Sequence, residues 1–250
     1  MFNNKKTLLS FLPIYLFLAL SVTSCSNSRI WSLGSKGKSI AQGIDVSEYQ
    51  GDINWQVSKT SNIDFAYARA SEGIDIKDDK FKKNWEGIKD AGILRGAYHF
   101  FIFGDSPQEQ VKNFLYQFSL EKGDLAPMID IEPGSLIKGR KFSKQLLKED
   151  LLFTLELIEK NTKCSPIIYT NYSFGNTYLT DTRFSKYKLW IADYDVNEPN
   201  IPNTWKKKNW FIWQYSIKKN FAGVTSKGGK VDQNKSRLNK ENFKKLLICL

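Results

Sequence analysis

The sequence predicts an α/β fold, a barrel of eight strands that is regularly β/α in its first half and not in its second. From residue 40 onward lie about 210 residues without a low-complexity insert or a repeat of fixed period, a length that one large α/β domain fills. Apolar extended runs alternate with helical patterns in the first half. After Pro166 the extended runs leave little room for full helices. Parallel sheets of this type bury both faces and carry their chemistry at the carboxyl ends of the strands.

Eight extended runs are the candidate strands, and four other segments carry helical patterns. The strands are expected at residues 43–46, 64–70, 94–101, 126–131, 166–170, 188–192, 209–215 and 230–232. Apolar side chains recur at helical spacing over residues 81–88, and Gly92 follows as a candidate left-handed C-cap. A capping box with proline at the first helical position predicts that a second helix begins after Ser106. Two further helices are predicted at 143–160 and 239–250.

Residues 1–24 have the layout of a secretory signal peptide. Lys5 and Lys6 precede an uncharged apolar stretch, 8–22, that contains Pro13 and is shorter than the roughly 20 residues of a membrane span. We therefore expect this segment to be removed from the mature protein.

The end of that segment resembles a bacterial lipobox. It reads Val-Thr-Ser-Cys, and in such a motif the cysteine, here Cys25, is acylated and becomes the mature N-terminus. Two or more acyl chains make a stable membrane anchor. The Gly/Ser/Lys-rich segment 25–39 is expected to be a flexible linker, and 40–250 the folded domain. The expected location is the bacterial cell envelope, at the periplasmic or outer-membrane face or at the cell surface.

The mature chain stays basic. Removal of the signal takes away two lysines and no acid, so the formal charge of +11 becomes +9. This charge suits polyanionic surroundings such as cell-wall polymers, and the scattered lysines do not indicate nucleic acid as a partner. Cys164 and Cys249 could form one disulfide or remain two thiols.

Carboxylates stand at four of the predicted strand ends: Asp45 at the first, Asp130 and Glu132 at the fourth, Asp193 after the sixth and Asp232 at the eighth. Because strand ends of a parallel barrel meet at one rim, we expect these acids to converge. Asp130 and Glu132 would share one strand face, and like charges that close raise the pKa of at least one carboxyl group. A carboxylic acid that stays protonated near neutral pH can act as a general acid.

Aromatic and polar side chains are expected at the same rim. A groove with acids on its floor and aromatic rings in its walls suits sugars, whose faces stack on aromatics while their hydroxyls form hydrogen bonds. The candidates for contact with a sugar are Tyr67, Arg69, Tyr98, His99, Tyr169, Asn171, Asp193, Trp213 and Gln214. For any single aromatic the alternative is core packing, and His99 could equally be a buried wall residue.

Seven short motifs occur in the order that one enzyme family shows. They are GIDVSEYQG (43–51), GAYHF (96–100), DIE (130–132), IYTN (168–171), WIADY (190–194), WQY (213–215) and VDQN (231–234). Over nearly all of residues 41–236 the chain therefore resembles the glycoside hydrolase family 25 lysozymes, although Gln233 stands where the family usually has a bulkier apolar or aromatic residue.

The resemblance implies an irregular TIM-like barrel of five β/α units followed by three β-strands. It also implies hydrolysis of the β-1,4 bond from N-acetylmuramic acid to N-acetylglucosamine in peptidoglycan. Glu132 would be the general acid, and Asp45, Asp130 and Asp232 the other acids of the site. The alternative is an envelope lipoprotein that binds peptidoglycan without turnover. The retention of every acid favours the enzyme.

No metal or cofactor is expected. The chain has one histidine, no spaced His/Cys cluster and no Gly-x-Ser-x-Gly motif, which argues against a zinc peptidase or a serine hydrolase. Two routes remain open for the sugar: substrate-assisted retention, with Asp130 orienting the acetamide, or direct attack by water with Asp130 or Asp45 as base and inversion. We expect the protein to be a monomer.

Overall fold

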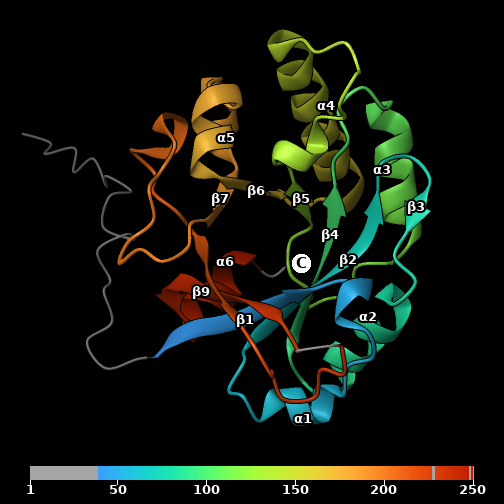
Figure 1. Cartoon of the computed structure of the whole chain (residues 1–250), viewed down its shortest axis with the longest axis vertical. Coiled ribbons are helices and arrows are strands. Elements are labelled where there is room, and N and C mark those ends of the chain that lie inside the picture. The colour runs from blue at the N-terminus through green and yellow to red at the C-terminus, as the bar shows by residue number, and fades with distance from the viewer. Residues whose placement is uncertain (1–38, 227–228, 248, 250) are drawn as a thin grey trace, which may run out of the picture. The chain divides into compact units, whose positions relative to one another are not determined.

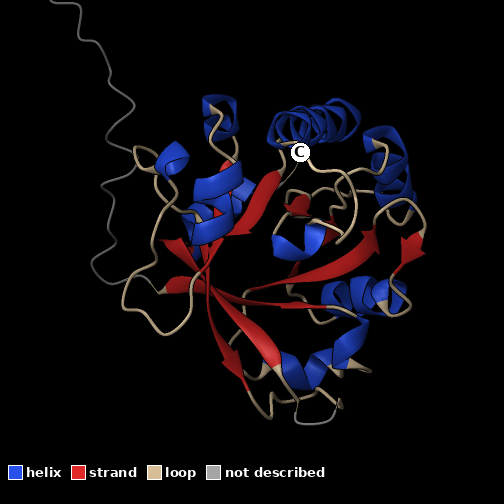
Figure 2. Ribbon diagram, turned by 45° about the horizontal axis from the view of Figure 1, so that its top comes forward, coloured by secondary structure: helices blue, strands red, loops and turns tan. Residues whose placement is uncertain are grey.

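Eight strands close into a barrel, and a ninth, short strand extends one of them (Figures 1 and 2). The computed structural model describes residues 39–226, 229–247 and 249, which belong to one unit, Ser35–Leu250. The predicted signal peptide, Cys25 and residues 25–38 of the predicted linker lie outside the described residues. The strands are β1 (Ile40–Val46), β2 (Phe65–Glu72), β3 (Ile76–Lys77), β4 (Leu94–Phe100), β5 (Met128–Asp130), β6 (Ile167–Asn171), β7 (Lys188–Ala192), β8 (Ile212–Lys218) and β9 (Val231–Asn239). All eight predicted strands are present and only the two-residue β3 was not predicted, but β9 is much longer than the predicted 230–232, so the placement of Asp232 at the end of its strand was wrong.

The strand order around the sheet is β1-β9-β8-β7-β6-β5-β4-β2-β3, and parallel pairing of β1 with β2 closes the ring. The pairs from β2 to β8 within the ring are also parallel. β9 instead runs antiparallel to both of its neighbours, β8 and β1. A parallel crossover usually needs a helix, and no helix lies between β8 and β9 in the described residues. Asp232 therefore lies near the start of its strand, and it still reaches the active rim because β9 begins where the parallel strands end.

Helices lie around the strands, most of them in the first two thirds of the chain (Figures 1 and 2). They are α1 (Trp55–Lys59), α2 (Phe81–Asp90), α3 (Pro107–Tyr116), α4 (Lys144–Thr162), α5 (Tyr172–Tyr178) and α6 (Lys240–Leu247). The four predicted helices are confirmed. α1 and α5 were not predicted, because five and seven residues are too short to show a clear helical period. Gly92 adopts a left-handed conformation after α2, and the Ser106 side chain accepts the Glu109 N–H at the start of α3, as predicted.

The barrel interior is filled with aromatic side chains below the rim. Phe65 stacks on Phe243 of α6 with ring centroids 4.6 Å apart, and Tyr67 meets Trp190 edge-on at 4.9 Å. A Cβ at Gly96 would lie 2.3 Å from Tyr67 Cε1, so glycine lets that ring pack against β4. The interior is a packed core, and any open site must lie above it at the rim.

A disulfide joins Cys164, just before β6, to Cys249, after α6, with Cα atoms 5.6 Å apart. The two positions are 85 residues apart, so the bond connects the C-terminal segment to the middle of the barrel. This settles the pairing that the sequence left open.

Candidate active site

The four proposed acids come from three strands at one rim of the barrel. Asp45 lies in β1 and pairs directly with Asp232 in the antiparallel register of β1 and β9. Asp130 is the last residue of β5. Glu132 follows as the residue before a 3-10 turn, Pro133–Ser135, and its backbone N–H donates to the Ser135 hydroxyl at 3.1 Å. Asp130 and Glu132 are therefore near neighbours, but Glu132 is held by a turn and not by the strand.

Two side-chain amides donate to Asp45. Its Oδ1 accepts from Gln214 Nε2 at 2.9 Å and from Asn234 Nδ2 at 2.6 Å. Trp190 Nε1 donates to Asn234 Oδ1 at 2.9 Å, and Tyr169 OH donates to Gln214 Oε1 at 2.7 Å. Because each amide oxygen already accepts a proton from a ring, each amide must turn its NH₂ group to Asp45.

The Asp45 carboxyl group holds its proton at neutral pH. Burial, with the charge of Asp232 as the next cause, raises the pKa of Asp45 to about 8. The two amide donors act in the opposite direction. Both donors occupy Oδ1.

The remaining acids are also shifted toward the protonated form. Burial raises the pKa of Asp232 to about 6. Burial followed by the charge of Asp232 raises the pKa of Glu132, whereas burial followed by the charge of Glu132 raises that of Asp130. We expected Asp130 to raise the pKa of Glu132, and the structure gives that role to Asp232. Asp130 Oδ1 is buried and has no hydrogen-bond partner among the described residues, so it can accept one from a ligand.

A cavity of about 430 Å³ opens beside Glu132 between the rim ends of β6 and β7. Its lining residues are Glu132, Tyr169, Asn171, Tyr172, Ser173, Ala192, Asp193 and Tyr194. Tyr172 and Tyr194 are partly exposed, and Tyr194 OH also donates to Gln214. Two exposed phenol rings next to a carboxyl group with a raised pKa suit a sugar ring.

Five of the predicted sugar-contacting residues lie at the groove or its cavity. Tyr169, Asn171 and Asp193 line the cavity. Burial raises the pKa of the Tyr98 phenol, and the charges of Asp45 and Asp130 raise it further, which places Tyr98 near these two acids. Gln214 is buried beneath the acids and donates a hydrogen bond to Asp45.

The other four predicted residues do not offer free groups to the groove. Tyr67 is fully buried and donates its OH to the Ala126 carbonyl in the barrel floor. Trp213 follows the strand alternation: because Gln214 faces Asp45, Trp213 faces outward, where Lys235 Nζ lies 4.0 Å from its ring centroid. Arg69 forms ion pairs with three carboxylates, those of Glu48, Glu72 and Asp78.

His99 lies on the outer side of β4, fully buried against Phe114 of α3. Its Nε2 lies 3.2 Å from Gln110 Oε1, which also accepts the Ile102 N–H, and its Nδ1 lies 2.8 Å from Ser71 Oγ. Gln110 Oε1 can only accept, so His99 carries its proton on Nε2 and accepts from Ser71. Burial lowers the pKa of His99 to about 4. His99 is a neutral wall residue and not a groove residue.

Sequence reasoning missed Asn234, Trp190 and Tyr194 as members of the site. Asn234 stands two residues from Asp232, so the same alternation that links Asp130 to Glu132 predicts that it shares the face of Asp232. For Trp190 in β7, and for Tyr194 two residues after that strand, the signal was weaker, since a large aromatic residue is most often core.

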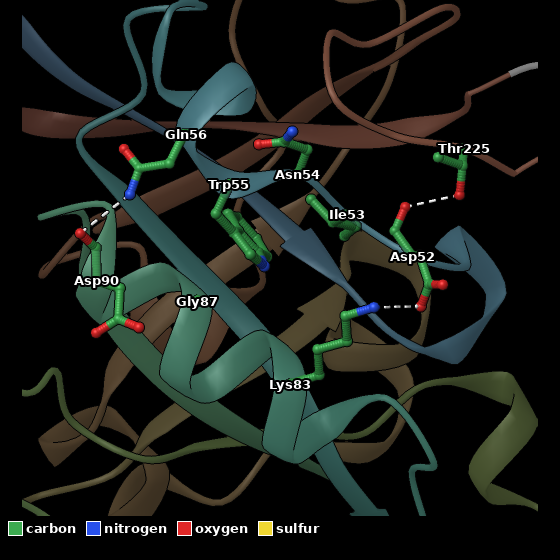
Figure 3. A pocket seen from close by; sticks show the side chains of 9 residues that line it. All are labelled: Asp52, Ile53, Asn54, Trp55, Gln56, Lys83, Gly87, Asp90 and Thr225. Atoms are coloured by element: carbon green, nitrogen blue, oxygen red, sulfur yellow. Dashed lines mark hydrogen bonds and ion pairs between the residues drawn. The ribbon is translucent and has the colours of Figure 1, made fainter.

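A second hollow, of about 490 Å³, lies between α1 and α2, and none of the groove acids lines it (Figure 3). Trp55 packs there against Gly87, where a Cβ would come within 2.4 Å of its ring. Asp52 pairs with Lys83 at 3.0 Å, and its carbonyl accepts the Thr225 hydroxyl at 2.7 Å (Figure 3). These contacts attach the β8–β9 connection to the segment after β1.

None of the helices in the described ranges combines the length and apolar character needed to cross a membrane. In the part of the chain that the structure describes, no three His, Cys, Asp or Glu side chains stand together so as to hold a metal ion.

An α/β barrel that gathers carboxyl groups with raised pKa values and aromatic walls at its rim has the features of a glycoside hydrolase site. The family model for glycosyl hydrolases family 25 matches residues 44–224. Lysozyme M1 of Streptomyces globisporus is 32% identical over 213 residues, which cover 82% of this chain and 70% of that protein. The protein YegX of Escherichia coli (strain K12) is 34% identical over 197 residues, 77% of this chain and 68% of that one. The crystal structure of the bacterial lysozyme from Streptomyces coelicolor matches with a TM-score of 0.75 at 32% identity, covering 83% of this chain and 97% of that chain. The chain belongs to glycosyl hydrolases family 25.

Proposed function

We propose that this protein is a peptidoglycan hydrolase that cleaves the β-1,4 bond between N-acetylmuramic acid and N-acetylglucosamine. The observation that carries the proposal is Glu132, whose pKa is raised by burial and then by the charge of Asp232, beside the tyrosine-walled cavity in a chain that belongs to a family whose members include lysozymes. A positioned general acid typically contributes about 10²–10⁴-fold to the rate.

Glu132 gives its proton to the glycosidic oxygen as the bond from the anomeric carbon breaks. In the substrate-assisted route, the acetamide oxygen of the muramic acid then bonds to the anomeric carbon. Asp130 accepts the acetamide N–H through Oδ1, which has no hydrogen-bond partner in the described residues. That N–H and the developing positive charge favour the ionised form of Asp130. Water then attacks the anomeric carbon from the opposite face and breaks its bond to the acetamide oxygen, while Glu132 takes the proton of the water, so the configuration is retained.

Inversion requires a carboxylate that removes a proton from water directly. Asp45 is poorly suited, because its raised pKa leaves it protonated at neutral pH and two amides occupy its Oδ1. We therefore propose retention. Proton NMR of the anomer first released from a soluble glycan, before mutarotation, should detect the β form, and an initial α product would return the role of base to Asp130 or Asp45.

The experiment that tests hydrolysis is digestion of purified peptidoglycan with wild-type protein and Glu132→Gln. Wild type should release fragments with N-acetylmuramic acid at the new reducing end, identified by mass spectrometry after borohydride reduction. Glu132→Gln should fold normally and lose at least about a hundredfold of the rate. A new reducing end on N-acetylglucosamine, or full lysis by the variant, would contradict the assignment. A binder without turnover would release no fragments at all.

We further propose that the mature protein is a monomeric envelope lipoprotein anchored through Cys25. The support is the lipobox-like sequence before Cys25 and the disulfide between Cys164 and Cys249, since such bonds persist mainly in oxidising compartments. The anchor would keep the enzyme at its polymeric substrate.

A further inference from the structure

Tyr49 is a rigidly mounted aromatic residue with a solvent-facing ring. It is 73% exposed, and it lies in the 3-10 turn Glu48–Gln50 that follows β1. On one side of it, the Glu48 N–H donates to Asp78 Oδ2 at 2.8 Å. On the other, Gln50 Nε2 donates to the Lys230 carbonyl at 3.2 Å, just before β9 begins. The backbone on both sides of Tyr49 is therefore fixed while its side chain reaches outward.

Arg69 supports one face of the Tyr49 ring, with its guanidinium carbon 5.0 Å from the ring centroid. Arg69 is nearly buried, and each of its guanidinium nitrogens faces a different carboxylate. Nε pairs with Asp78 at 3.0 Å, Nη1 with Glu72 at 3.1 Å and Nη2 with Glu48 at 2.9 Å. These bonds hold the guanidinium plane and engage all three of its nitrogens. Arg69 thus acts as a base for the ring and not as an anion-binding group.

The strand order puts Tyr49 across the rim from the tyrosine-walled cavity. Tyr49 follows β1, four residues after Asp45, and its support comes from β2. Counted around the ring, β7 is three strands from β1, and β6 is three strands from β2. The cavity between β6 and β7 and the Tyr49 turn are therefore on opposite sides, with the acids of β1, β5 and β9 between them. A polymer bound in the cavity at Glu132 and crossing the acids would leave the groove at Tyr49.

We propose that Tyr49 is a sugar-stacking platform at the end of the groove opposite the Tyr172/Tyr194 cavity, and that it binds a distal sugar of a long glycan. The identity of that glycan rests on the proposed peptidoglycan hydrolysis. The sugar is a neutral N-acetylhexosamine face and not the acidic lactyl or peptide portion, because Glu48, Glu72 and Asp78 more than compensate the charge of the Arg69 that supports the ring. A ring that is already held in place loses little conformational entropy on binding.

The test measures binding in a Glu132→Gln background, so that no glycan is cleaved. The probes are peptide-free glycan strands from amidase-treated peptidoglycan, sorted into long strands and tetrasaccharides, and the dissociation constant is measured by calorimetry. Tyr49→Ala should weaken binding of long strands by about three- to tenfold, the range of one lost aromatic contact, and leave tetrasaccharide binding unchanged. Tyr49→Trp should restore the affinity.

Tyr116→Ala is the matched control. Tyr116 is 80% exposed at the end of α3, and Lys77 Nζ lies 5.3 Å from its ring centroid. The Tyr116→Ala variant therefore also loses an exposed ring next to a cation. It should bind both probes like its parent. Thermal unfolding of each variant checks that the fold is intact.

Three outcomes would overturn the platform: unchanged binding of long strands by Tyr49→Ala, an equal loss for both probes, or no binding of long strands by the parent. The wild-type digestion separates this inference from hydrolysis. If long strands bind in a Tyr49-dependent way but wild type cleaves no glycan, the platform stands and the proposed hydrolysis is refuted. If wild type hydrolyses peptidoglycan normally but binding does not depend on Tyr49, the hydrolysis stands and the platform is refuted.

Discussion

His99, the single histidine of the chain, should make the protein less stable in mild acid. Burial lowers the pKa of His99 to about 4, whereas an unfolded histidine has a pKa of about 6.5. Between those values the unfolded chain binds a proton that the folded protein does not. The contribution of His99 to the free energy of unfolding is therefore complete above about pH 6.5 and is lost as the pH falls toward 4.

The size of the effect follows from the pKa difference. One pKa unit corresponds to about 1.4 kcal/mol, so the full loss is about 3 kcal/mol, of which about 2 kcal/mol falls between pH 8 and pH 5. The groove acids act in the opposite direction, because the pKa values of Asp45 and Asp232 are raised and the folded state binds protons there as the pH falls. A pH series on wild type alone would therefore mix the two effects.

Comparison with His99→Gln isolates the histidine, because the variant keeps the groove acids and has no imidazole to titrate. Urea unfolding at pH 8 and at pH 5 gives the free energy of unfolding of both proteins. The advantage of wild type over the variant should shrink by about 2 kcal/mol at pH 5. Proton NMR of the single imidazole should show no titration above about pH 5. Parallel stability curves, or a folded imidazole that titrates near 6.5, would refute the buried neutral histidine.

Three further predictions concern the groove, the anchor and the disulfide. Asp232→Asn removes the negative charge that raises the pKa of Glu132, so the alkaline limb of the pH–rate profile should move to lower pH, and an unmoved limb would argue against this coupling. Cys25→Ser should move the protein from the membrane to the soluble fraction without changing the activity of the purified domain, and retention in salt-washed membranes would exclude this anchor. Replacing Cys164 and Cys249 together by serine should lower the free energy of unfolding by about 4 kcal/mol in urea titrations, given a loop of 85 residues, whereas equal stability would show that the bond adds no constraint.

Most of the barrel strands could be predicted because they are apolar runs that need two covered faces, whereas β9 is mostly polar and only its first residues were predicted. The direction of β9 could not be predicted, since the pattern of side chains along a strand is the same whichever way the chain runs. The short elements β3 and α1 could not be predicted either, because they contain too few residues to establish a period.

His99 and Trp213, two of the predicted site residues that lie away from the groove, do so for one physical reason. Successive strand residues face opposite sides of a sheet, and this alternation was applied to Asp130 and Glu132 but not to adjacent pairs. Tyr98 and His99 cannot both face the barrel interior, and the same holds for Trp213 and Gln214. In each pair the structure turns one member to the groove side and the other to the outer core.

The reversal of β9 also explains how Asp45 is held. In an antiparallel pair, directly opposite residues point to the same face with Cβ atoms about 4.5–5.5 Å apart. The register of β1 and β9 sets Asp45 opposite Asp232 and Gly43 opposite Asn234, so one strand brings both a charged neighbour and an amide donor to Asp45. The Phe65 ring occupies the space that a Cβ at Gly43 would need, and Asn234 Nδ2 reaches Asp45 Oδ1 at 2.6 Å. A helix-linked parallel strand would reach the rim with its last residues only, whereas β9 starts at the rim and continues down the barrel beneath the acid that it supports.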